Sequence, residues 1–257
     1  MKRVTQLNRI IIVLTLVAGT TSLPTLAAPA QINRYTDTRR PLEQRHAEIT
    51  QLGKQGDAQS VQTLMALGNS DAYTRVKAIE SLGKVGPHRA GLAKSRNGGT
   101  DIAAYLRDKL HHPEPGVACA AIQSLVRIEG TNALDDVRAF LGRNRERIDG
   151  FQSVVLPLGV KALAGIDDPR SVKLLEREID EVVKPIQEFE YGSHIVGALA
   201  RLGRPEGRAV LTSYASWLQS QIPADNPMVA EYIRAKRKEA LEAAKGIGNS
   251  AQQGGVR

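Results

Sequence analysis

DAYTRVKAIESLGKVG, residues 71–86, is the stretch of sequence that decides the fold. Its closing phrase LGKVG at 82–86 repeats the LGKQG found thirty residues earlier, at 52–56. Its middle, AIESL, returns as AIQSL at 121–125. A separate phrase, VKALA at 160–164, recurs as VGALA at 196–200. Because irregular echoes at spacings of thirty to about forty-five residues are typical of helical repeat arrays, we expect stacked repeat units.

The apolar spacing inside each unit is helical. Val172, Leu175, Ile179 and Val182 recur at steps of three and four, and no segment alternates with period two. Asp168-Pro169 reads as an N-cap followed by proline at the first helical position. Each unit is therefore predicted to be two antiparallel helices. We expect first helices near 41–54, 71–85, 114–129, 151–166, 186–202 and 227–247, and second helices near 57–68, 100–111, 132–143, 169–183 and 205–221.

The segment 71–86 resembles the HEAT-like repeat first recognised in phycobilin lyases. An opening acid, an Arg75-Val76 pair, several alanines and the closing Leu82-Gly83 carry the resemblance, with the order of the pair inverted from the usual Val-Arg. It extends over 41–248 and implies an all-α fold: a right-handed α-α superhelix (HEAT/ARM-like solenoid) of about five helix pairs, with second helices lining the concave face. It implies little about function, because such repeats occur in lyases, hydroxylases, DNA-repair enzymes and plain binding scaffolds.

The first residues have the three-part pattern of a signal peptide. Residues 1–9 contain only basic charges, 10–18 (IIIVLTLVA) are apolar, and small residues follow. The apolar run is about half the length needed to span a bilayer. We therefore predict a signal peptide over 1–27, cleavage near Ala27 or Ala30, a periplasmic or secreted protein, and no stable membrane insertion. The segments 28–40 and 249–257 are expected to be disordered.

Charge and location together limit the possible partners. The chain has 35 basic and 27 acidic residues, and loss of 1–27 lowers the net charge from +8 to +5. A moderately basic exported protein favours anionic partners, whereas solvated surface lysine is the structural alternative. Since an exported protein meets little nucleic acid, we expect no nucleic-acid binding.

The enzyme motifs of related repeats are missing. HEAT-like hydroxylases use His-Glu dipeptides, and no histidine here precedes a glutamate. Phycobilin lyases act on a chromophore inside the cell, which an exported chain does not meet. His111-His112 with Asp108 and Glu114 raises a metal hypothesis, against a histidine-rich helix end. Cys119 is expected to be a buried thiol. We expect no catalytic residue, no metal and no cofactor; the alternative is a metal-dependent or lyase-type enzyme built on the solenoid.

Two clusters of basic residues interrupt the regular spacing of the repeat units. The segment 86–99 is inserted between helices that we expect to pair, and several arginines follow the helix expected at 132–143. The structural alternatives are a solvated loop and helix-end cations that stabilise the dipole. We predict an exported scaffold or adaptor, without catalysis of its own, that binds a protein or anionic polymer in its concave groove. The candidate anionic-partner surface consists of Arg89, Lys94, Arg96, Arg107, Arg138, Arg143, Arg145 and Arg147.

Overall fold

The computed structural model describes residues 29–86, 101–145 and 155–253, and within these ranges the regular structure is entirely helical. None of the helices in these ranges has both the length and the apolar character needed to cross a membrane. The helices are α1 Pro29–Thr36, α2 Leu42–Gln55, α3 Ala58–Leu67, α4 Ala72–Leu82, α6 Ile102–Lys109, α7 Pro115–Glu129, α8 Leu134–Asn144, α9 Val155–Leu163, α10 Pro169–Glu178, α11 Lys184–Ile186, α12 Phe189–Leu202, α13 Pro205–Ser220 and α14 Pro227–Gln253.

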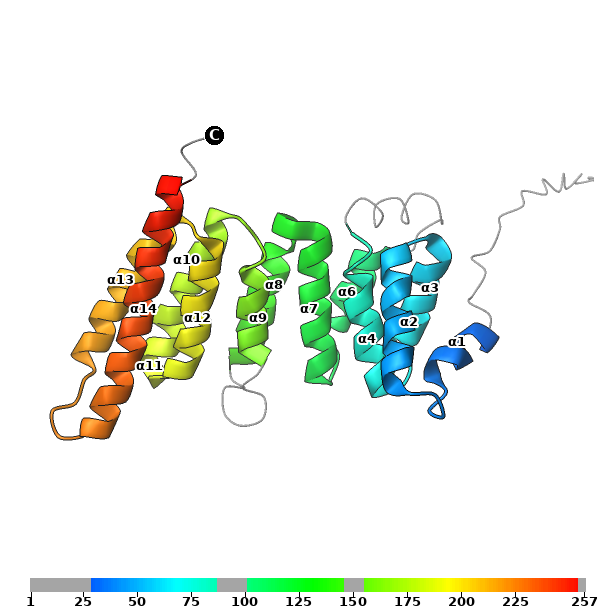
Figure 1. Cartoon of the computed structure of the whole chain (residues 1–257), viewed down its shortest axis with the longest axis horizontal. Coiled ribbons are helices and arrows are strands. Elements are labelled where there is room, and N and C mark those ends of the chain that lie inside the picture. Colours follow the sequence, from blue (N-terminus) through cyan, green and yellow to red (C-terminus); the bar gives the residue numbers. More distant parts are fainter. Residues whose placement is uncertain (1–28, 87–100, 146–154, 254–257) are drawn as a thin grey trace, which may run out of the picture.

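The helices form two layers, and in each layer they succeed one another along the long axis of the molecule (Figure 1). We call α2, α4, α7, α9, α12 and α14 the inner helices, and α3, α6, α8, α10 and α13 the outer helices. Successive inner helices run in the same direction, so their C-terminal ends share the upper edge of Figure 1. This arrangement confirms the predicted all-α solenoid of about five helix pairs.

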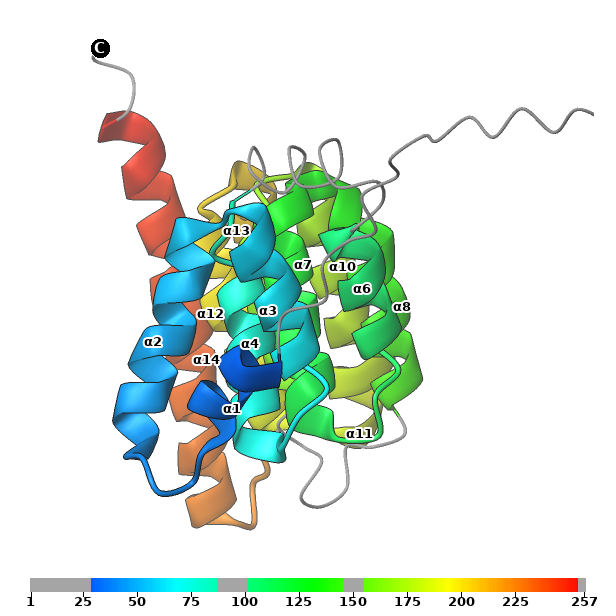
Figure 2. The ribbon, with the colours of Figure 1, turned by 90° about the vertical axis from the view of Figure 1, so that its right-hand side faces the viewer.

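The curvature is opposite to the expectation. In Figure 2 both layers bow in the same direction, and the inner helices lie on the hollow side. Neighbouring inner helices also pack closely along the whole row, whereas neighbouring outer helices barely touch. The concave face is therefore lined by the helices that come first in the predicted pairs, which corrects the prediction that second helices line it.

The pairing of helices is also shifted by one. Each outer helix packs more closely against the inner helix that follows it in sequence than against the one before it. The compact pairs are therefore α3/α4, α6/α7, α8/α9, α10/α12 and α13/α14. As a result the segment 86–99 joins one pair to the next, whereas the sequence had suggested that it lies within a pair.

Small residues explain why the inner helices approach so closely. A Cβ placed on Gly53 of α2 would lie 2.3 Å from the carbonyl oxygen of Ser81 in α4. A Cβ on Gly83, which follows α4, would lie 2.8 Å from the Cα of Ser124 in α7. Ser124 Oγ in turn donates a hydrogen bond to the backbone oxygen of Ile79, at 2.9 Å. Backbones this close leave the inner layer shorter than the outer layer, and so the array bends toward it.

Aspartates start several helices. The carboxylates of Asp57, Asp71, Asp101 and Asp168 accept hydrogen bonds from backbone N–H groups in the first turns of α3, α4, α6 and α10. At the other end, Gly203 takes the left-handed conformation, with φ 63°, immediately after α12. The Asp168-Pro169 start predicted from the sequence is thus confirmed.

Both segments that we expected to be disordered contain helix. α1 lies within 28–40 and packs against α2 and α3 through Ile32 and Tyr35. Arg40 donates hydrogen bonds to the Arg34 carbonyl at 2.7 Å and to Glu48 of α2 at 2.6 Å. The guanidinium groups of Arg40 and Arg34 lower the pKa of Glu48 to about 2. At the other end, α14 continues to Gln253, into the predicted tail 249–257. Ion pairing and helix propagation supply the order that composition did not indicate.

The close contact at Gly53 gives a stability prediction. Gly53→Ala should lower the free energy of unfolding by about 2 kcal/mol, because the new methyl group meets backbone atoms that cannot move aside. Gly197→Ala in α12 is the matched control: its Cβ would meet nothing within 4 Å, so helix propensity should raise stability by up to about 1 kcal/mol. Urea denaturation followed by circular dichroism measures both. Equal effects of the two substitutions would show that the α2–α4 contact is not tight.

Candidate functional site

The structure places the predicted anionic-partner residues that it describes on or beside the outer layer. Arg107 lies on α6, Arg138 and Arg143 lie on α8, and Arg145 directly follows α8. These helices are on the convex side of the array (Figure 2). The other four residues of that surface lie outside the described residues: Arg89, Lys94, Arg96 and Arg147.

Two of these arginines are bound within the chain. Arg107 pairs with Glu129, and its Nε lies 3.0 Å from a carboxylate oxygen of Asp136. Arg145 pairs with Glu178 and Glu181. Such side chains have already satisfied their charge, so they are poorly placed to recruit an anionic partner.

Arg138 and Arg143 are more accessible. Arg138 makes a long ion pair of 3.5 Å with Asp135 on the surface. Arg143 makes no ion pair within the described residues; it lines a cavity of about 310 Å³ together with His111 and His112. The structure therefore brings no continuous row of free arginines together along α6 and α8.

Arg145 has a structural role. The carboxylate of Glu178 is 3% exposed and accepts hydrogen bonds from Arg145 at 2.5 Å and from the Tyr191 hydroxyl at 3.0 Å. Burial, and then the charge of Glu178, raise the pKa of Tyr191. Glu178 is the last residue of α10 before a π-helical turn over Ile179–Val183. The pair thus joins the end of α8 to the wide turn of α10.

Two residues of the metal hypothesis, His112 and Glu114, are in contact with an arginine. The guanidinium of Arg75 donates to Glu114 at 2.7 Å and to the Ser70 carbonyl at 2.6 Å, and it lies 3.4 Å from His112 Nε2. The other ring nitrogen of His112 accepts from the Glu114 N–H at 3.1 Å. A positive charge therefore already sits between the two proposed ligands. Across the described ranges, no group of three or more His, Cys, Asp or Glu residues has an arrangement that could hold a metal ion.

Cys119 has the environment of a structural thiol. It is buried in α7, and burial raises its pKa to about 11. A thiol with that pKa forms little thiolate near neutral pH, so it is a weak nucleophile.

The exposed residues of the inner helices form stripes on the concave face. An inner helix has neighbours on both sides and the outer layer behind it, so one face remains for solvent. On α4 and just after it, this face carries Tyr73, 72% exposed, then Lys77 and Lys84. On α12 it carries His194 and Arg201. The spacing follows the helical repeat.

One exposed cation recurs at or near the C-terminal end of each inner helix from α2 to α12. We call this set the concave basic row; it consists of Lys54, Lys84, Arg127, Lys161 and Arg201. Lys84, Arg127, Lys161 and Arg201 make no ion pair within the part of the chain that the structure describes. The concave face thus presents free positive charge, in contrast to Arg107 and Arg145 of the outer layer, which are paired.

The first part of the row is electrostatically strained. Burial lowers the pKa of Lys84 below its usual value, as do the nearby charges of Lys77, Arg127 and Lys54, and Glu80 opposes them only in part. Glu80 is itself within 3.4 Å of Lys77. Three neighbouring helices therefore place like charges close enough to repel one another.

The last two cations of the row border one cavity. A space of about 370 Å³ opens between α9 and α12, with Lys161 on one side and Arg201 on the other. The remaining lining residues are mostly apolar or small: Pro157, Leu158, Ala164, His194, Gly197 and Ala198. The cavity lining therefore combines apolar surface with two positive charges.

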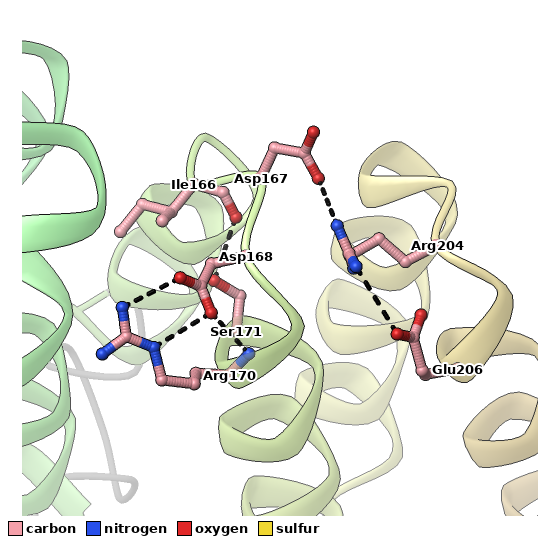
Figure 3. Close-up of polar contacts among 7 residues, drawn as sticks. All are labelled: Ile166, Asp167, Asp168, Arg170, Ser171, Arg204 and Glu206. Atoms are coloured by element: carbon pink, nitrogen blue, oxygen red, sulfur yellow. Dashed lines mark hydrogen bonds and ion pairs between the residues drawn. The ribbon is translucent and has the colours of Figure 1, made fainter.

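Carboxylates at the same edge are neutralised by other arginines (Figure 3). Asp168 accepts from the guanidinium of Arg170 at 2.9 and 3.0 Å, which lowers its pKa to about 2. Arg204, after α12, pairs with Asp167 at 2.8 Å and with Glu206 at 3.5 Å. These contacts join the α9–α10 turn to the α12–α13 turn. The acids that they hold do not pair with Lys161 or Arg201.

The concave basic row was not predicted from the sequence, although the sequence contains a signal for it. In four inner helices the cation follows a leucine by two residues, as in Leu82-Gly83-Lys84 and Leu125-Val126-Arg127. Residues two apart on a helix point about 200° away from each other. A buried leucine therefore directs the cation to solvent on the opposite face. In α9 the matching position is Gly165, and Lys161 stands one turn earlier.

Comparison with known proteins finds two engineered structures of low similarity to this chain. No family model and no curated protein matches the chain. Among solved structures, an engineered protein is 15% identical with a TM-score of 0.40, over 84% of this chain and 97% of its own. A designed armadillo repeat protein in complex with the peptide (KR)4 is 16% identical with a TM-score of 0.44, over 87% of this chain and all of its own. At these TM-scores the two structures do not bear on the fold, and the solenoid architecture rests on the order and packing of this chain's own helices.

The different environments of Arg145 and Arg143 give a second stability prediction. Arg145→Gln should lower the free energy of unfolding by about 3 kcal/mol, because it leaves the buried Glu178 carboxylate without its cation. Arg143→Gln, two residues earlier, should change it by less than about 0.5 kcal/mol. Thermal and urea unfolding of both variants measure the difference. If both substitutions change the free energy of unfolding by similarly small amounts, Arg145 is a solvated helix-end cation without a structural role.

Proposed function

We propose that the protein is an exported scaffold, without catalysis of its own, that binds a macromolecular partner along its concave face. The observation that carries this proposal is the contrast between the two faces. The inner helices expose unpaired cations and a cavity, whereas Arg107 and Arg145 of the convex side are held by internal carboxylates. This contrast supports the concave side as the binding face.

The shape of the face favours an elongated partner. Six inner helices follow one another in a single curved row, and each exposes one narrow stripe to the hollow side. A partner that lies across the row contacts one stripe from each helix, as is usual for repeat arrays. A compact small molecule would contact only one or two stripes.

Export is the second part of the proposal. Its support is the pattern of basic, apolar and small residues over 1–27, which precedes the described part of the chain. α1 begins at Pro29. Cleavage after Ala27 would leave α1 whole, while cleavage after Ala30 would remove its first two residues.

The absence of catalysis is the third part. Support comes from the Arg75 guanidinium beside His112 and Glu114, and from the high pKa of Cys119. A metal-dependent or lyase-type enzyme remains the rival, and elemental analysis of protein purified without a metal column tests it. Stoichiometric bound metal that is lost in His112→Ala would favour the rival.

Glycines on the two faces allow a steric test of the binding face. Gly197→Trp on α12 should fill the groove without disturbing the fold, because a Cβ there meets nothing within 4 Å. We expect it to reduce, by at least tenfold, the material that the immobilised protein captures from an extracytoplasmic extract of its source cells. Quantitative mass spectrometry of the captured fraction measures the loss.

The control is Gly142→Trp on the outer helix α8, where a Cβ also meets nothing within 4 Å. It should leave capture unchanged. Loss with Gly142→Trp and retention with Gly197→Trp would place the interface on the convex side, and equal retention would contradict a groove-binding function.

Intact mass spectrometry tests export. The protein recovered from outside the cytoplasm should begin at Ala28 or Gln31, because cleavage removes residues 1–27 or 1–30. A chain that keeps Lys2 and Arg3, or one found only in the cytoplasm, would contradict the signal-peptide assignment.

A further inference from the structure

We propose that the concave basic row binds an extended acidic peptide segment, with acidic residues at every third position and an apolar side chain near one end. This inference rests on the proposed function and names the class of its partner. It starts from the regular placement of the row, which supplies one exposed cation from each of five successive inner helices.

The spacing of the helices sets the spacing of the ligand charges. Packed neighbouring helices lie about 8–10 Å apart. An extended peptide advances about 3.3 Å per residue, so three residues carry it from one inner helix to the next. The five cations then correspond to a segment of about 13 residues. In α9 the position that corresponds to the other four cations is Gly165, and Lys161 lies one turn, about 6 Å, before it. The ligand contact with α9 is therefore displaced along the helix, toward the cavity.

Neighbouring cations of the row repel one another, and the carboxylates of an acidic ligand would reduce that repulsion. Lys84 lies among the charges of Lys54, Lys77 and Arg127, and desolvation together with these charges lowers its pKa. Two cations near the ends of outer helices, Arg107 and Arg177, pair with carboxylates. On the concave face such partners are missing among the described residues for Lys84 and Arg127. Carboxylates of a bound segment would complete these pairs.

The cavity between α9 and α12 favours a peptide over an anionic polysaccharide. Its lining combines apolar residues, among them Pro157, Leu158 and Ala198, with the two cations Lys161 and Arg201. A space of about 370 Å³ accommodates an aliphatic side chain flanked by two carboxylates. A sugar polymer has no comparable apolar group to place there.

One acid of the inner layer is already paired and lies away from the row. Glu190, at the start of α12, accepts hydrogen bonds from Tyr232 at 2.8 Å and from Lys236 at 3.0 Å, both on α14, whereas Arg201 of the row lies in the last turn of α12. Because the cavity lies between Lys161 and Arg201, the apolar position of the ligand lies between its last two acidic residues.

Two labelled peptides of identical composition test this inference by fluorescence anisotropy. Both have 13 residues, with five glutamates, one leucine and seven glycines or serines. In the spaced peptide the glutamates occupy positions 1, 4, 7, 10 and 13, with leucine at 11; in the block peptide they are contiguous. We expect the spaced peptide to bind at least tenfold more tightly at 0.05 M NaCl and to weaken strongly at 0.3 M. Replacing its leucine by serine should weaken binding about fivefold.

Matched variants locate the contacts. The triple variant Arg127→Gln, Lys161→Gln and Arg201→Gln should lose at least tenfold in affinity for the spaced peptide. The control, which removes three outer charges by Arg138→Gln, Arg143→Gln and Lys173→Gln, should lose less than twofold. Circular dichroism checks that both variants remain folded.

Three outcomes would overturn the inference: equal binding of the two peptides, equal losses in the two triple variants, or no binding of either peptide. Polyglucuronate that competes better than the spaced peptide would also overturn it, in favour of a polymer ligand. Each of these outcomes leaves the proposed function standing if Gly197→Trp still blocks capture. If Gly197→Trp does not block capture, the proposed function fails independently of the peptide result.

Discussion

The rest of the structure depends on backbone contact between neighbouring inner helices. At Gly53 against Ser81, and at Gly83 against Ser124, there is no room for another methyl group. Such contacts shorten the inner layer relative to the outer one, whose neighbouring helices barely touch. The curvature follows from that difference, and the curvature brings Lys54, Lys84 and Arg127 to one surface.

The sequence was sufficient for the architecture because it repeats. Leu-Gly closures such as Leu82-Gly83, and aspartate starts such as Asp168-Pro169, mark helix ends through local chemistry that needs no knowledge of the rest of the chain. The predicted layer assignment and helix pairing were wrong because both depend on contacts between different helices. Every helix of a solenoid contacts both its predecessor and its successor, and only the closeness of packing separates the two. The layer assignment, in turn, depends on contacts between inner helices such as Gly53 against Ser81, which lie on different helices.

The same limit applies to the candidate site. The arginine cluster near Arg145 was visible in the sequence, but its partner Glu178 lies thirty-three residues away and its burial depends on tertiary packing. Counting charges along the chain therefore overestimated the free charge of the convex side. The concave basic row has a sequence signal, the cation two residues after a leucine. That signal gains meaning only when the inner layer is known to line the hollow side.

Unequal packing along the inner layer gives the array unequal stiffness. At α2, α4 and α7 the helices meet through backbone atoms, so relative sliding is resisted at once. Between α9 and α12 an open volume of about 370 Å³ separates part of the interface. A solenoid deforms unit by unit, because each unit contacts only its neighbours. If the two ends of this solenoid were pulled apart, the α9–α12 interface would therefore deform first. The interfaces among α2, α4 and α7 would keep their geometry.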